Sequence, residues 1–112
     1  MAKPLTIRAV VFEERGRLVA QCLESDLCTS AQDRDELIRK LTAQVRHQIT
    51  LDLAKGCAPL SRLPRAPQKF WDMYSRGSAP EVLPIHGSWL GLLFRVWRWP
   101  SRVQANLALA TA

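Results

Sequence analysis

Four carboxylates near the start of the chain have the residue type that best suits metal-dependent chemistry, namely Glu13, Glu14, Glu24 and Asp26. A magnesium-dependent nuclease needs several carboxylate oxygens that converge on one point. Glu13 and Glu14 are neighbours, so on a strand their side chains point to opposite faces. We therefore expect solvated turn charges, no metal site and a protein that is not an enzyme. A degenerate hydrolase is the enzymatic alternative, and it requires a metal site that the sequence does not display.

Glu24 and Asp26 are separated by one residue, which lets them share a face at the end of a strand. In that position they could meet basic groups on a partner, a contact that raises the association rate more than the affinity. Both carboxylates are therefore candidate partner-binding residues, with a solvated loop as the alternative.

The histidines and cysteines suggest no catalytic or metal-binding arrangement. His47 and His86 are far apart in the sequence and have no nucleophile motif beside them. Cys22, Cys28 and Cys57 follow no metal-ligand spacing and come with no secretory leader. These features predict reduced, buried thiols in a cytoplasmic protein that uses no cofactor.

Aromatic side chains gather in the second half of the chain, outside the expected core. They are Phe70, Trp71, Tyr74, Trp89, Phe94, Trp97 and Trp99. Exposed aromatic clusters favour interfaces in which rings fill pockets on a partner. We therefore expect Phe70, Trp71 and Tyr74 to contact a partner, with a local minicore as the alternative.

Basic side chains interleave with tryptophans near the C-terminal end, at Arg95, Trp97, Arg98, Trp99 and Arg102. Such a composition could stack bases and neutralise phosphates of DNA or RNA. It also fits an amphipathic surface segment or an oligomer seam. Residues 57–112 carry seven Lys and Arg against two Asp and Glu, whereas residues 1–56 carry nine against eight. The excess positive charge therefore lies in the second half of the chain.

Alternating apolar residues predict a three-stranded antiparallel meander at the start of the chain. Residues 5–14 alternate as a strand, and Gly16 can adopt the positive φ of a tight turn. Residues 18–22 should return beside the first strand, and residues 27–30 should form a short third strand.

One long amphipathic helix should follow the meander. Asp33 and Glu36 match a capping pattern, and Lys55-Gly56 matches a helix end, which gives a helix of about 22 residues. An apolar stripe along it must lie on the sheet. The stripe consists of Leu37, Ile38, Leu41, Val45, Ile49 and Leu53.

The rest of the chain is less regular. Residues 59–67 contain three prolines and suit an extended connector, and residues 70–74 should form a short helical turn. Residues 103–109 alternate as a strand that could complete the sheet at an edge. The apolar stretch 89–99 is far shorter than the roughly 20 residues of a membrane-spanning helix, so no membrane segment is expected.

This pattern predicts three regions. Residues 1–56 form an α/β core, residues 57–84 form a Pro-rich connector with an aromatic segment, and residues 85–112 form a basic aromatic extension with a possible final strand.

The run Val19-Ala20-Gln21-Cys22-Leu23-Glu24-Ser25-Asp26-Leu27-Cys28-Thr29 resembles the signature of HicB-family antitoxins. The similarity extends upstream through Phe12-Glu13-Glu14-Arg15-Gly16-Arg17, and the helix that begins near Glu36 sits where that family has its helix. The segment Arg65-Ala66-Pro67-Gln68-Lys69-Phe70-Trp71-Asp72-Met73-Tyr74 is similar to a Pro-aromatic segment found after the helix in some members.

The resemblance implies an α+β fold of the partial RNase H-like type. Its β-β-β-α-β arrangement packs an antiparallel sheet on one long helix and lacks the nuclease's catalytic carboxylates. The resemblance also implies that the chain binds and silences a small basic HicA-type toxin that cleaves mRNA. We expect a homo-oligomer, a dimer or a tetramer, formed through strand edges. The second hypothesis is a stand-alone nucleic-acid-binding protein that uses the basic C-terminal segment.

Overall fold

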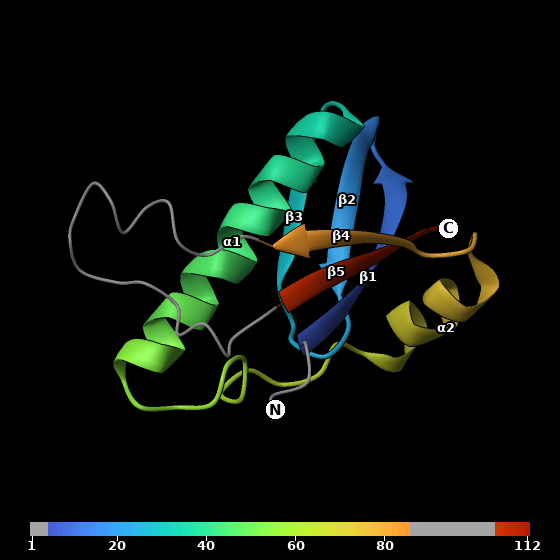
Figure 1. Cartoon of the computed structure of the whole chain (residues 1–112). Coiled ribbons are helices and arrows are strands. Elements are labelled where there is room, and N and C mark those ends of the chain that lie inside the picture. Colours follow the sequence, from blue (N-terminus) through green and yellow to red (C-terminus); the bar gives the residue numbers. More distant parts are fainter. Residues whose placement is uncertain (1–4, 86–104) are drawn as a thin grey trace.

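The first two strands form the hairpin that the sequence predicts. The structure, a computed structural model, describes residues 5–85 and 105–112 (Figure 1). Strand β1 (Leu5–Glu14) pairs antiparallel with β2 (Arg17–Cys22). The turn between them places both Arg15, at φ 53°, and Gly16, at φ 77°, in the left-handed region. Two consecutive positive φ angles give the turn whose twist matches that of the flanking strands.

Five strands build one mixed sheet in the order β3-β2-β1-β5-β4. The short β3 (Cys28–Ala31) pairs antiparallel with β2, as expected. Strand β5 (Ala105–Thr111) runs parallel to β1, and β4 (Glu81–Ile85) runs antiparallel to β5. The fold is therefore α+β, but the sheet is mixed and not wholly antiparallel.

Two expectations about the end of the chain are wrong. The final strand does not complete the sheet at an edge, because β5 lies between β1 and β4. The edge is formed instead by β4, most of which falls in the stretch 57–84 that was predicted to be a Pro-rich connector without a strand. Pro84 is compatible with β4 because an edge strand has one side without a neighbouring strand, where a missing N–H breaks no ladder hydrogen bond.

Helix α1 (Arg34–Ala54) confirms the predicted capping and apolar stripe. The Asp33 carboxylate accepts a hydrogen bond of 2.9 Å from the backbone N–H of Glu36, and Gly56 follows the helix at φ 72°. The stripe packs on one face of the sheet. Its fully buried members are Leu37, Leu41, Val45 and Ile49, while Ile38 and Leu53 are partly buried beside them.

A second helix, α2 (Gln68–Arg76), lies on the other face of the sheet and is longer than the expected turn at 70–74 (Figure 1). Side chains alternate along β1, so Ile7 and Val11 join the core under α1 while Phe12 faces α2. The rings of Phe12 and Phe70 stack with centroids 5.9 Å apart. The sheet therefore carries one helix on each face.

The connector between the helices is held by a buried carboxylate. Asp52 is fully buried, and it accepts hydrogen bonds from the Leu60 backbone N–H at 2.7 Å and from Arg62 Nε at 2.9 Å. Leu60 is one of two described non-glycine residues with a positive φ, at 62°. Because an αL conformation is strained for leucine, the bond to Asp52 helps to hold the turn in place.

The connector then crosses the end of the sheet to reach the second face. The backbone N–H of Asp26 donates to the Pro64 carbonyl at 2.8 Å, and the N–H of Ala66 donates to the Leu23 carbonyl at 2.9 Å. The other end of α2 is tied to β5, because the Ser78 N–H donates to the Thr111 carbonyl at 2.9 Å. A Cβ atom on Gly77 would lie 2.7 Å from that carbonyl oxygen, so this close approach requires glycine.

The three cysteines differ in environment, contrary to the expectation that all are buried. Cys22 is buried, Cys57 is half-buried and Cys28 is exposed, and all three are free thiols. Burial raises the pKa of Cys22 to about 12, with smaller contributions from Glu24 and Cys28. Burial also raises the pKa of Cys28, and the carboxylates of Asp26 and Glu14 add to that rise.

These environments predict an order of thiol reactivity. At pH 8, Cys22 should react with a disulfide reagent such as DTNB only after unfolding in urea, because a thiol with a pKa near 12 carries almost no thiolate. Cys57 and Cys28 should react in the folded protein, because neither is buried. Reaction rates of Cys28→Ser and Cys57→Ser variants would assign the phases, and rapid reaction of all three thiols would contradict the burial of Cys22.

Candidate functional site

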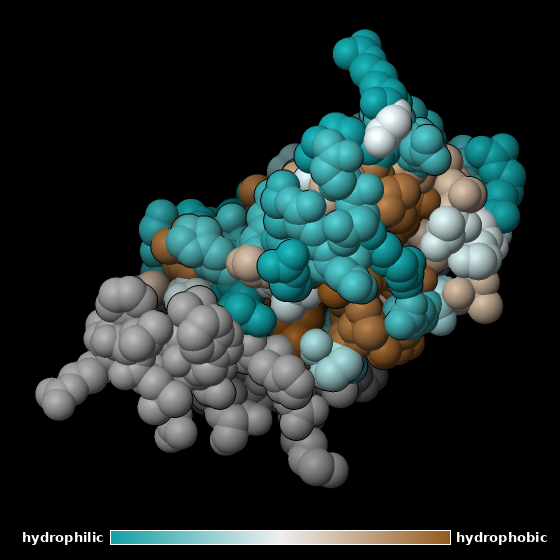
Figure 2. All heavy atoms as spheres, turned by 90° about the horizontal axis from the view of Figure 1, so that it is seen from above, coloured by the Kyte–Doolittle hydropathy of each residue, from teal (hydrophilic) through white to brown (hydrophobic). Residues whose placement is uncertain are grey.

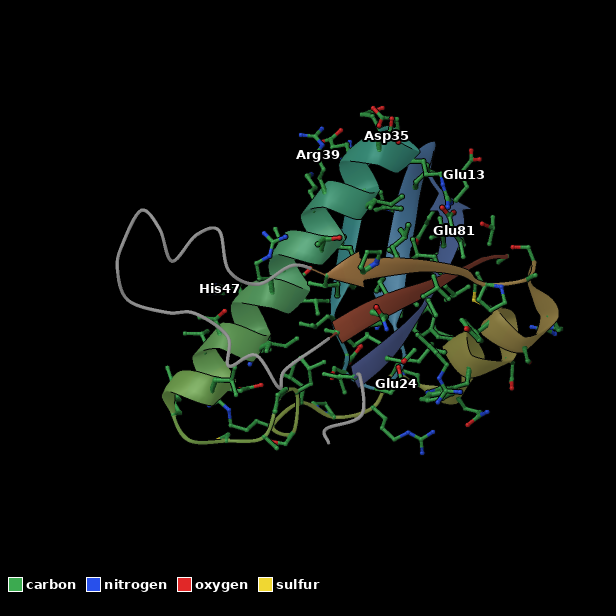
Figure 3. The ribbon with its side chains drawn as sticks, in the orientation of Figure 1. Glu13, Glu24, Asp35, Arg39, His47 and Glu81 are labelled. Atoms are coloured by element: carbon green, nitrogen blue, oxygen red, sulfur yellow. The ribbon has the colours of Figure 1, made fainter. Side chains whose placement is uncertain are left out.

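The second face of the sheet carries a cluster of charged and aromatic side chains under α2. Arg8 projects from the middle of β1, and its Nε donates to Glu24 Oε2 at 2.5 Å. The backbone N–H of Arg8 donates to Glu24 Oε1 at 2.8 Å. Both oxygens of Glu24 are therefore committed to Arg8. Figure 3 shows Glu24 at the end of the sheet where the connector crosses.

Trp71 joins α2 to this ion pair. Its indole Nε1–H donates to the Ala66 carbonyl at 3.2 Å, which fixes the orientation of the ring. The guanidinium carbon of Arg8 lies 4.7 Å from the ring centroid, and that of Arg65 lies 4.3 Å from it. Both distances are within the range of cation–π attraction. One tryptophan thus holds two guanidinium groups.

Tyr74 and Phe70 extend the cluster along α2. Burial raises the pKa of the Tyr74 hydroxyl, while Arg8 lowers it and Glu24 raises it, so the hydroxyl lies near this ion pair. The Lys69 ammonium lies 4.9 Å from the centroid of the Phe70 ring. No residue of α2 is buried, and Phe70, Trp71 and Tyr74 remain partly accessible. We call Arg8, Glu24, Arg65, Phe70, Trp71 and Tyr74 the α2 surface.

The structure brings together most of the partner-binding residues predicted from the sequence. Glu24, Phe70, Trp71 and Tyr74 belong to the α2 surface. Asp26 does not, because its carboxylate accepts a hydrogen bond of 2.7 Å from Gln21 Nε2. The sequence did not single out Arg8 and Arg65.

A signal for the two arginines was nevertheless present. The alternation of β1 places Arg8 on the same face as Phe12, and Arg65 stands two residues before the proline that precedes α2. The sequence did not show where Trp71 lies, and the Trp71 ring brings these two side chains together.

The predicted nucleic-acid-binding residues lie outside the described residues. They are Arg95, Trp97, Arg98, Trp99 and Arg102.

The four carboxylates considered for metal chemistry do not converge. Figure 3 shows Glu13 near the tip of the β1–β2 hairpin and Glu24 at the opposite end of the sheet. Among residues 5–85 and 105–112, no group of three or more His, Cys, Asp or Glu side chains could hold a metal ion. His47 lies on the outer side of α1 (Figure 3).

The arrangement of the α2 surface suits binding through aromatic rings and guanidinium groups.

The comparisons with known proteins give no further guide to the site. No family model, no curated protein and no solved structure matches the chain. In the part of the chain that the structure describes, no helix is long and apolar enough to cross a membrane.

Proposed function

We propose that this chain is a HicB-like antitoxin that binds and neutralises a small basic HicA-type, mRNA-cleaving toxin in the cytoplasm without catalysing a reaction. The observation that supports this proposal best is the order of the elements. Strands β1, β2 and β3 are followed by α1, and the chain later returns with a strand, β5, beside β1. That order agrees with the β-β-β-α-β arrangement implied by the resemblance.

The finer description of the fold as partial RNase H-like is part of the same proposal. Helix α1 and the segments after it carry the chain from β3 back to a strand parallel to β1. Such a parallel pairing needs a crossover connection and cannot be made by a tight hairpin. In this proposal, α2 and β4 are additions to the common arrangement, and α2 supplies the binding surface.

The composition of the α2 surface favours a protein partner. Tryptophan, tyrosine and arginine are enriched among residues that contribute most to protein–protein affinity. Trp71 lies beside Arg8 and Arg65, and both oxygens of Glu24 are engaged by Arg8. A toxin seated on this surface would lose access to RNA, because the antitoxin would cover its active face.

Self-association forms part of the proposal, but the edges of the sheet are poorly suited to it. The Ser30 carbonyl of the outer strand β3 accepts a hydrogen bond of 3.1 Å from Lys40 Nζ. The other outer strand, β4, contains Pro84. A proline in an edge strand, or a side chain from another element that covers its backbone, opposes pairing with a second sheet. We therefore propose that a dimer or tetramer forms through a surface other than the outer edges of β3 and β4.

Co-expression with the small reading frame beside the gene tests the proposal. The wild-type chain should bind the product of that frame in affinity capture and rescue growth. Trp71→Ala should weaken binding by about 30-fold and impair rescue, because truncating a central tryptophan typically costs at least 2 kcal/mol. Val82→Ala removes a side chain that is 61% exposed on β4 and serves as the control.

Circular dichroism should show that both variants are folded. Capture and rescue that are unchanged in Trp71→Ala would remove the α2 surface from the proposal. A folded wild-type chain that neither binds the product of the adjacent reading frame nor rescues growth would contradict the antitoxin role.

The charge distribution supports a second candidate, a nucleic-acid-binding protein. Residues 57–112 carry seven Lys and Arg against two Asp and Glu. Binding through phosphate contacts should weaken steeply as salt rises, because each neutralised phosphate releases counterions. Titrations of DNA and RNA at two salt concentrations separate this function from toxin binding.

A further inference from the structure

Arg65 differs from Arg8 in the partners of its guanidinium group. Among the described residues, its guanidinium contacts the Trp71 ring at 4.3 Å, and no carboxylate or carbonyl accepts a hydrogen bond from it. The other arginine on the same ring, Arg8, is paired with Glu24. Two cations therefore share one indole, and the described residues supply one carboxylate between them.

This arrangement leaves a local excess of positive charge in a fixed position. The Trp71 ring is held by its bond to the Ala66 carbonyl, and the backbone N–H of Ala66 is tied to Leu23 in turn. A guanidinium stacked on a fixed ring keeps its N–H donors free around its edge. Such a group binds a carboxylate through two parallel hydrogen bonds, a geometry that lysine cannot reproduce.

We propose that Arg65, held against Trp71, binds an aspartate or glutamate side chain of a protein partner. The proposal rests on the partner-binding function assigned to the α2 surface and names the group that the partner must present. A second carboxylate would balance the pair of guanidinium groups as Glu24 balances Arg8. The overall charge of the partner does not decide this contact, because one carboxylate within reach of Arg65 is sufficient.

The geometry favours a carboxylate over a nucleic acid. Base stacking needs an open aromatic face, but two guanidinium groups already lie against the Trp71 ring. Phosphate binding along a backbone needs a row of unopposed cations, and Asp72 stands between Lys69 and Arg76 on the same side of α2. The surface is therefore better matched to a single carboxylate than to a phosphate chain.

An NMR titration tests the contact without requiring the toxin. The probe is a capped peptide, Ala-Glu-Leu-Glu-Ala, added to the full chain, with the Gln-for-Glu peptide at equal ionic strength as the control. The glutamate peptide should shift the Arg65 Nε–Hε and Trp71 Nε1–Hε1 signals, while the glutamine peptide should not. Arg15, at the hairpin tip, should stay unmoved.

Variants identify the group responsible. Arg65→Lys should raise the Kd of the peptide at least about fivefold, as read from the Trp71 signal, because the bidentate contact is lost while the charge is kept. Lys69→Ala, which removes a neighbouring cation, should leave the Kd within about twofold. An unchanged Kd in Arg65→Lys, or no shift in the wild-type chain, would overturn the proposal.

Two further outcomes have defined meanings. A deoxythymidine decamer that shifts the same signals at lower concentration than the peptide would overturn the proposal in favour of nucleic acid. A glutamate-specific shift in a chain that fails to bind the toxin would support the Arg65 contact and refute the antitoxin role. The two proposals can therefore fail separately.

Discussion

Replacing Asp52 by alanine is expected to lower the free energy of unfolding by about 3 kcal/mol. The carboxylate is fully buried, and it accepts hydrogen bonds from the Leu60 N–H, Arg62 and Gln48. Its removal leaves the buried Leu60 N–H without an acceptor while Leu60 still adopts a positive φ. The expected loss of stability is at the lower end for a buried ion pair, because the Arg62 side chain is 39% exposed and water can solvate it when Asp52 is removed.

Urea denaturation of the variant measures this loss. Asp35→Ala is the matched control, because Asp35 is an exposed carboxylate in the first turn of the same helix. Its loss should cost about 0.5 kcal/mol through the helix dipole alone. Hydrogen exchange at the Ala66 and Asp26 amides should also accelerate in Asp52→Ala, because these two N–H groups form the hydrogen bonds that join the connector to the end of the sheet. Equal stability of the two variants would contradict the role given to Asp52.

Leu107→Ala should destabilise the protein by about 3 kcal/mol, because it leaves a cavity in the core. Leu107 has no exposed surface, and it lies on β5, where it pairs with Ile7 of β1 and Leu83 of β4. The variant therefore tests whether the C-terminal strand is inserted inside the sheet.

Leu51→Ala provides a comparison with the same change in side chain. Leu51 is 37% exposed on α1, so its truncation should cost less than about 1 kcal/mol. Thermal and urea unfolding of both variants would measure the difference. A Leu107 variant as stable as the Leu51 variant would place β5 outside the core and would contradict the position of β5 between β1 and β4.

The sequence was sufficient for elements fixed by local chemistry. The turn at Gly16 determines the β1–β2 hairpin, because its positive φ and the charged tip allow little else. The Asp33 cap and the stripe from Leu37 to Ile49 determine α1. In each case, the residues that define the element are close in the sequence, so periodicity and capping predict it directly.

The sequence was insufficient where strands pair over long distances. Nothing near residues 105–111 indicates that β5 lies parallel to β1, because register between distant strands depends on the whole core. Strand β4 was not predicted from the sequence. It contains Pro84, and a proline is acceptable in a strand only at an edge, at the first residue or at a bulge. Whether a strand lies at the edge depends on how the whole sheet is assembled, and the residues near Pro84 do not show this.

The candidate site was predicted in part for a similar reason. The aromatic residues of α2 stood out by type, and Glu24 by its position at a strand end. Arg8 and Arg65 gain their significance only from the shared Trp71 ring, which brings together residues 57 positions apart. Figure 2 shows hydrophilic side chains over much of the described part seen from above, with hydrophobic patches between them, and Figure 3 places Asp35 and Arg39 at that end.

The most direct test of the central claim is the affinity of the purified chain for the product of the adjacent small reading frame, measured by isothermal titration calorimetry. The account predicts saturable binding that Trp71→Ala weakens by about 30-fold and Val82→Ala leaves unchanged. It also predicts that the bound product no longer cleaves mRNA. No heat of binding from two folded proteins, together with undiminished mRNA cleavage in the mixture, would contradict the claim.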